Sequence, residues 1–116
     1  MKYKKSSSQL AFVKSHEMNP THPESGLTRR IGAYNDKLML AEHRMNKGWI
    51  GTLHSHPHEQ LVYVVQGRIK VVAGSTTFEA GTGDSFVVGG NVEHQASALE
   101  DSLVVDVFTP SREDYQ

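Results

Sequence analysis

The chain of 116 residues contains no cysteine, and this absence excludes disulfide bonds, zinc–thiolate sites and a cysteine nucleophile. It also lacks any apolar run near the roughly 20 residues that a membrane-spanning helix needs, so we expect no membrane partner. An excess of one charge is missing too, because 12 basic and 13 acidic residues give a formal net charge of −1. Such a balance offers no basic surface for nucleic acid, and we expect none as a partner.

The N-terminal stretch, residues 1–8, is basic and polar, but no long apolar segment follows it. It therefore does not resemble a secretory signal, and we expect a cytoplasmic protein. The next polar stretch, residues 18–26, has two prolines and a closing glycine and is typical of a loop. The length fits a single domain. We expect an N-terminal arm and loop over residues 1–26 and one barrel domain over residues 27–116.

Short segments rich in β-branched and aromatic residues fill the rest of the chain, and turn residues separate them every 8–12 positions. No segment has a sustained helical period, so the pattern predicts an all-β fold, either an antiparallel sandwich or a barrel. The expected strands are 27–34, 38–45, 49–54, 60–65, 68–72, 76–79, 85–88, 94–98 and 103–108.

A histidine cluster is the most informative feature of the sequence. Side chains alternate between faces along a strand, so His54, His56 and Gln60 would point the same way in an unbulged strand. Two imidazoles at this spacing can chelate a transition metal. The alternative is a polar surface loop or an edge strand with exposed histidines. Pro57 can bulge or turn the chain, which leaves the direction of His58 open.

A second segment, residues 83–94, reaches another histidine, His94, after a glycine-rich turn. Taken together, the two segments resemble the cupin family. The positions that match the first cupin motif are Gly51, His54, His56, Gln60 and Gly67, and those that match the second are Gly83, Gly89, Gly90, Asn91 and His94. Gly89 replaces the usual proline, and Asn91 stands where glycine is common, but both suit a turn.

The resemblance implies a single-domain cupin barrel, also called a double-stranded β-helix or jelly roll, with one divalent metal ion on His54, His56, Gln60 and His94. The usual cupin ligand at the position of Gln60 is glutamate. A neutral amide with three neutral imidazoles leaves the metal its full charge, which favours anionic ligands and Lewis-acid chemistry. Nickel, zinc, manganese and iron all remain open, because imidazole-rich ligation does not separate them.

The C-terminal segment carries a carboxylate, Asp106, inside an otherwise apolar strand. Alone, Asp106 would be interpreted as a surface acid, Arg112 as a surface residue and Phe108 as core. With the histidine cluster, however, the D-x-F-x-P-x-R-x-D-Y pattern of residues 106–115 resembles a cupin subgroup, the pectin-degradation enzymes that linearise 4,5-unsaturated uronates. That resemblance implies that Asp106, Phe108 and Arg112 line the metal cavity. The reaction needs a proton carrier and a group that holds the substrate carboxylate, and Asp106 and Arg112 suit these two roles, while Phe108 would form a cavity wall.

We therefore expect a metal-dependent enzyme, of the isomerase or ring-opening type, that converts unsaturated uronates from pectin or alginate to linear 5-keto-4-deoxyuronates. Its partner would be a small anionic sugar, and the family resemblance implies a homodimer. Two alternatives stay open, a metal-dependent cupin dioxygenase and a non-catalytic sugar- or small-molecule-binding module. His58 and Glu59 line the rim of the site or lie in a solvated loop, and Trp49 and Tyr63 are expected in packing or dimer contacts.

Overall fold

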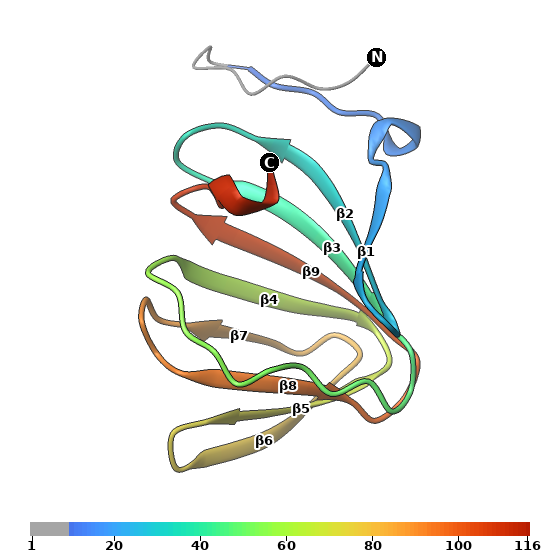
Figure 1. Cartoon of the computed structure of the whole chain (residues 1–116), viewed down its shortest axis with the longest axis vertical. Coiled ribbons are helices and arrows are strands. Elements are labelled where there is room, and N and C mark those ends of the chain that lie inside the picture. Colours follow the sequence, from blue (N-terminus) through green and yellow to red (C-terminus); the bar gives the residue numbers. More distant parts are fainter. Residues whose placement is uncertain (1–9) are drawn as a thin grey trace.

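Two antiparallel sheets form the part of the chain that the computed structural model describes, residues 10–116 (Figure 1). The larger sheet has the strand order β1-β2-β3-β9-β4-β7, and the smaller has the order β6-β5-β8. The elements are η1 (Ser15–Glu17), β1 (Pro20–Glu24), β2 (Leu27–Tyr34), β3 (Met39–Met45), β4 (Glu59–Gln66), β5 (Arg68–Ala73), β6 (Thr76–Gly81), β7 (Ser85–Val88), β8 (His94–Ala98), β9 (Ser102–Thr109) and η2 (Glu113–Tyr115). The all-β prediction is confirmed.

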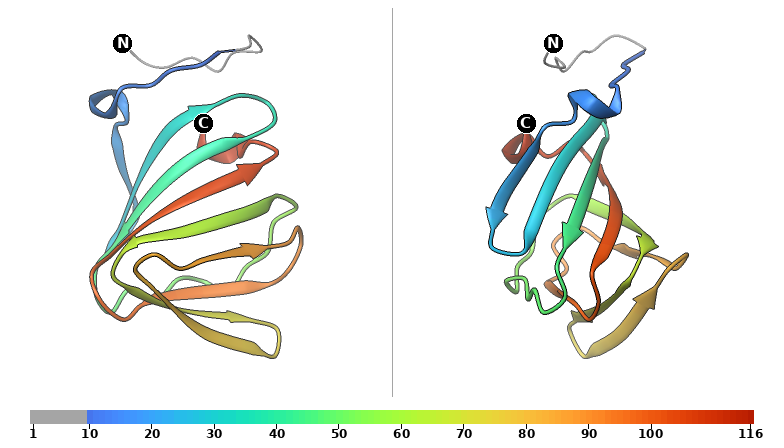
Figure 2. Two further views of the ribbon diagram at one scale, coloured as in Figure 1. Left: turned by 180° about the vertical axis from the view of Figure 1, so that it is seen from behind. Right: turned by 90° about the vertical axis from the view of Figure 1, so that its right-hand side faces the viewer.

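Alternating burial along the central strands places the core between the two sheets. In β3 every second residue from Met39 to Met45 is buried, and in β9 every second residue from Ser102 to Phe108 is buried. Since strand side chains alternate between faces, one face of the large sheet points inward. The buried cluster is Leu27, Met45, Val62, Val64, Ile69, Val71, Ala80, Ala98 and Val104, with Trp49, Phe78 and Phe86 packed against it. Figure 2 shows the two sheets from behind and from the side.

Two details differ from the sequence-based expectation. Residues 20–24, expected in a loop, form β1 and pair with β2, with Pro20 opposite Arg30 and Thr21 opposite Arg29. Every residue of β1 is exposed at the sheet edge, which is where a strand tolerates proline. Residues 49–54, expected as a strand, make only isolated bridges to β8 at Ile50 and His54. The backbone bonds of this segment to β8 are irregularly spaced, so no regular ladder forms.

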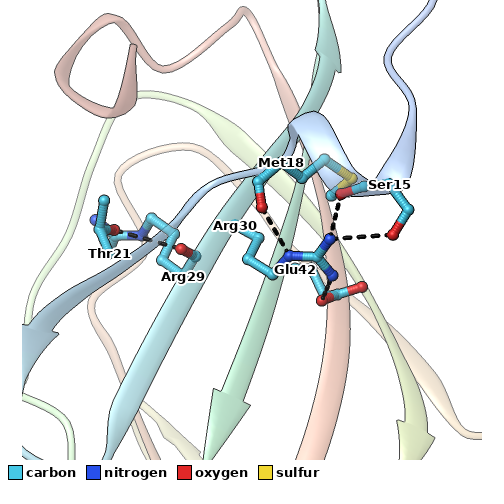
Figure 3. Close-up of polar contacts among 6 residues, drawn as sticks. All are labelled: Ser15, Met18, Thr21, Arg29, Arg30 and Glu42. Atoms are coloured by element: carbon cyan, nitrogen blue, oxygen red, sulfur yellow. Dashed lines mark hydrogen bonds and ion pairs between the residues drawn. The ribbon is translucent and has the colours of Figure 1, made fainter. Parts of the chain in front are cut away.

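Hydrogen bonds from Arg30 of β2 hold the segment before β1 against the outer face of the large sheet (Figure 3). The guanidinium of Arg30 donates to the carbonyl oxygens of Met18 and Ser15 and forms an ion pair with Glu42 of β3 at 2.9 Å. The basic residues 1–8 lie outside the described residues. Within residues 10–116, no helix has both the length and the apolar character needed to cross a membrane.

Candidate active site

A row of four polar side chains crosses the inner face of the large sheet. The strand register places Arg29 of β2 opposite His43 of β3, and Gln60 of β4 opposite Phe108 of β9. Asp106 precedes Phe108 by two residues on β9 and therefore shares its face. The row Arg29, His43, Asp106 and Gln60 thus follows the strand order β2-β3-β9-β4.

Direct hydrogen bonds join the four side chains of this row. Arg29 Nε donates to His43 Nε2 at 3.0 Å, His43 Nδ1 lies 2.6 Å from Asp106 Oδ2, and Gln60 Nε2 donates to Asp106 Oδ1 at 2.7 Å. Because His43 Nε2 accepts a bond, its proton is on Nδ1, and the ring is neutral. Both Asp106 oxygens accept, which is the pattern of an ionised carboxylate. Asp106 is only 3% exposed, so it is a buried acid and not a surface one.

Three histidines converge next to this row. His54 lies opposite His94 in an isolated bridge, and one ring nitrogen from each of His54, His56 and His94 lies within 4.8 Å of the others. In each ring Nδ1 lies 2.8–3.0 Å from a backbone carbonyl oxygen two residues away, at Thr52, His58 and Val92 respectively. These bonds place the proton on Nδ1 and leave the three Nε2 lone pairs free, as metal-ligating histidines require.

Burial keeps two of the three rings neutral. It lowers the pKa of His56 and of His94 below the usual 6.5, and the positive charge of Arg112 lowers both further. A neutral imidazole is the form that binds a metal ion.

Gln60 completes the candidate metal site. Its Oε1 lies 3.1 Å from His56 Nε2, while its Nε2 donates to Asp106. A neutral His56 whose proton is on Nδ1 cannot also donate from Nε2, so two lone pairs face each other at this contact. A cation held by Gln60 and His56 would resolve this conflict. The donor set therefore fits a divalent ion, and the structure brings together all four residues expected as ligands.

A cavity of about 330 Å³ opens beside the histidines. The polar row forms one wall, together with His54, His94 and Arg112. Most of the remaining lining is apolar, but Glu24, Thr52 and Tyr115 also contribute. Its volume suits a small ligand held by a few polar groups.

The C-terminal residues close one side of this cavity. Phe108, 1% exposed, meets the ring of His56 edge-on at 5.9 Å. Arg112 is buried, and its Nε and Nη2 donate to the two carboxylate oxygens of Asp114 at 3.0 and 2.7 Å. Burial disfavours the charge of Arg112, but the contacts with Asp114 and Tyr115 together outweigh it and raise the pKa of Arg112. The bond to Arg112 lowers the pKa of Asp114. A substrate carboxylate therefore cannot use the Nε–Nη2 edge of Arg112 unless it displaces Asp114.

Tyr115 of η2 lies against both guanidinium groups of the cavity. The Cζ atoms of Arg29 and Arg112 are 3.7 and 4.1 Å from its ring centroid. Burial raises the pKa of Tyr115, so its hydroxyl keeps its proton. Sequence reasoning missed Arg29, His43 and Tyr115. His43 could have been found because it lies on the same face of its strand as the apolar residues Met39, Ala41 and Met45, which are buried. Arg29, half-buried on β2, had no comparable sequence signal.

The structure also places the residues whose role the sequence left open. Trp49 packs against the core and donates from Nε1 to Glu24 at 2.6 Å, which confirms a packing role. Tyr63 is 49% exposed on the outer face, so its dimer contact stays a prediction. Glu59 is exposed at the start of β4. His58 has a buried Nδ1 that meets no hydrogen-bond partner within residues 10–116.

Comparison with known proteins agrees with the two-sheet fold and the histidine site. The family model that matches is the cupin domain, over residues 41–108. The chain belongs to the cupin family.

Within that family it is similar to KdgF proteins. The pectin degradation protein KdgF of Dickeya dadantii (strain 3937) is 36% identical over 92 residues, which span 78% of this chain and 84% of that protein. The solved structure of KdgF from Halomonas sp. is 37% identical with a TM-score of 0.87, and the match covers 93% of this chain and 100% of that one. An RmlC-like cupin from Shewanella frigidimarina NCIMB 400 is 31% identical with a TM-score of 0.85, covering 90% and 95% of the two chains.

Proposed function

We propose that this chain is a metal-dependent enzyme of pectin or alginate breakdown that converts 4,5-unsaturated uronates to linear 5-keto-4-deoxyuronates. The observation that carries the proposal is the position of Asp106, a buried carboxyl group that lines the cavity and accepts a hydrogen bond from Gln60 beside the three histidines. The similarity to a protein named for pectin degradation supports the same assignment.

The residues that would hold the metal are His54, His56, Gln60 and His94. When bound, a divalent ion supplies positive charge that stabilises negative charge developing on a substrate oxygen. All four donors are neutral, so none of them offsets that charge. Nickel, zinc, manganese and iron are the candidate metals.

The reaction is an isomerisation that moves one proton. Opening the hemiacetal breaks the bond between C1 and the ring oxygen, C1 becomes an aldehyde, and the ring oxygen becomes an enol hydroxyl on C5. The enol becomes a ketone when C4 gains a proton. The net transfer is therefore from the C1 hydroxyl oxygen to C4.

Asp106 is the proposed carrier of this proton. Each of its oxygens accepts one hydrogen bond, from His43 or from Gln60, and retains a lone pair for a substrate proton. Phe108 forms the adjoining cavity wall. Arg112 adds positive charge there, but its Nε and Nη2 atoms already donate to Asp114.

The test uses the ultraviolet absorbance of unsaturated galacturonate, which is lost when its double bond disappears. Metal-loaded protein should remove this absorbance faster than the spontaneous reaction, chelator-treated protein should not, and added metal should restore the rate. Sugar binding without absorbance loss would instead identify a binding module. Oxygen uptake by the iron-loaded protein would identify a dioxygenase.

A further inference from the structure

The cavity contains two arginines in different electrostatic states. Arg112 has its Nε–Nη2 edge on both oxygens of Asp114, so its charge is compensated by a carboxylate of the same chain. Arg29 uses only Nε, which donates to His43. Among the described residues, its guanidinium has no ion-pair partner, and no hydrogen bond engages either terminal nitrogen.

Arg29 is held in a fixed place on the cavity wall. Its Cζ lies 3.7 Å from the ring centroid of Tyr115, and its bond to His43 fixes the Nε side of the guanidinium. A neutral imidazole does not offset the positive charge. The remaining Nη1–Nη2 edge presents two parallel N–H groups, the geometry that matches a carboxylate.

We propose that Arg29 binds the carboxylate of the substrate through its Nη1 and Nη2 atoms, and that His43 is its positioning residue. The chemical identity of the acid rests on the proposed function. In an unsaturated uronate, C4 is two bonds from the carboxylate carbon. A carboxylate on Arg29 therefore brings C4 to the side of the cavity where His43 is hydrogen-bonded to Asp106. The rest of the sugar then extends toward His54 and His94.

The test compares Arg29→Gln with Arg44→Gln on two substrates. Arg44 is exposed on β3 next to His43, so its substitution removes the same charge outside the cavity. The substrates are unsaturated galacturonate and its methyl ester, which lacks the anionic group. Their intrinsic difference in reactivity is common to all variants and cancels when preferences are compared.

The Arg29→Gln variant should lose about 10- to 100-fold in kcat/KM for the acid, mainly through KM, and should lose its preference over the ester. Arg44→Gln should keep that preference. Arg29→Lys keeps the charge without the paired N–H edge and should fall between. The proposal is overturned if folded Arg29→Gln retains the preference for the acid, or if Arg112→Gln alone abolishes it.

A binding experiment separates this inference from the proposed reaction. Calorimetry with nickel-loaded protein measures the difference in Kd between saturated galacturonate and galactose, which has no carboxylate. If galacturonate binds more tightly and Arg29→Gln removes the difference, Arg29 is the carboxylate site even when no turnover occurs. If Arg29→Gln leaves the difference intact, the inference fails even when the enzyme linearises uronates.

Discussion

The side-chain amide of Gln60 donates to Asp106 Oδ1 at 2.7 Å, and its carbonyl oxygen consequently faces His56 Nε2. The reverse orientation would set two oxygens against each other at Asp106. One carboxylate therefore determines which atom of the glutamine is turned toward the candidate metal site. The proposed ligand and the proposed proton carrier are thus linked by a single hydrogen bond.

Gln60→Glu tests this link, because it places a second carboxylate beside Asp106. Two adjacent carboxylates resist simultaneous ionisation, so one of them should hold a proton. We expect metal content to be retained, since glutamate is a good ligand, and kcat to fall at least about 10-fold. Elemental analysis and initial rates measure the two effects. Glu59→Gln, at the exposed neighbouring position, should leave both unchanged. Full activity of Gln60→Glu would contradict the coupling.

Asp106→Asn should abolish linearisation and leave the metal bound. An asparagine has one acceptor oxygen, whereas Gln60 and His43 both donate to this side chain. One buried donor thus loses its partner, at a cost of about 1–3 kcal/mol in the free energy of unfolding. Urea denaturation, metal analysis and the absorbance assay check the three expectations. Wild-type turnover in this variant would remove Asp106 from the reaction.

The metal-free protein should become less stable as the pH falls below about 6.5. Burial lowers the pKa of His56 and His94 in the folded state, so the unfolded chain binds more protons than the folded one between the lowered values and 6.5. The free energy of unfolding then rises with pH through this window, and this gain is lost on acidification. Urea midpoints at pH 7.5 and 5.5 measure the change. An unaltered pH dependence in the doubly substituted His56→Gln, His94→Gln protein would refute this origin.

The outer face of the large sheet is expected to join two copies of the chain. Leu61 is 47% exposed and pairs with Val87, 64% exposed, on one side and with Val107 on the other. A contiguous apolar surface of this kind marks an interaction site. Light scattering should give a dimer for the wild type and a monomer for Leu61→Lys. Ile50→Lys, at an exposed apolar residue outside the named strands, is the control, and a monomeric wild type would exclude the dimer.

Local patterns made most of the fold predictable. β4 is dense in branched and aromatic residues, and its turn to β5 carries Gly67 at a φ of 101°, a backbone conformation that favours glycine. The exposed strand β1 was missed because its five residues include two prolines and no other apolar side chain.

The pair His54 and His56 was predictable as a candidate metal site because the spacing is local, whereas His94 and Asp106 were assigned only through the resemblance to cupins. The contact between Arg29 and His43 depends on the register between β2 and β3, and the sequence of neither strand alone predicts that register. The pairing of Arg112 with Asp114 likewise depends on the turn into η2.

The most direct measurement is a nickel titration of chelator-treated protein, followed by both bound metal and loss of substrate absorbance. One equivalent per chain should bind, and activity should saturate at that same equivalent. His56→Ala and His94→Ala should lose both, because each removes one of the converging nitrogens. Full activity in the metal-free wild type, or a wild-type chain that binds no metal at this site, would contradict a metal-dependent enzyme.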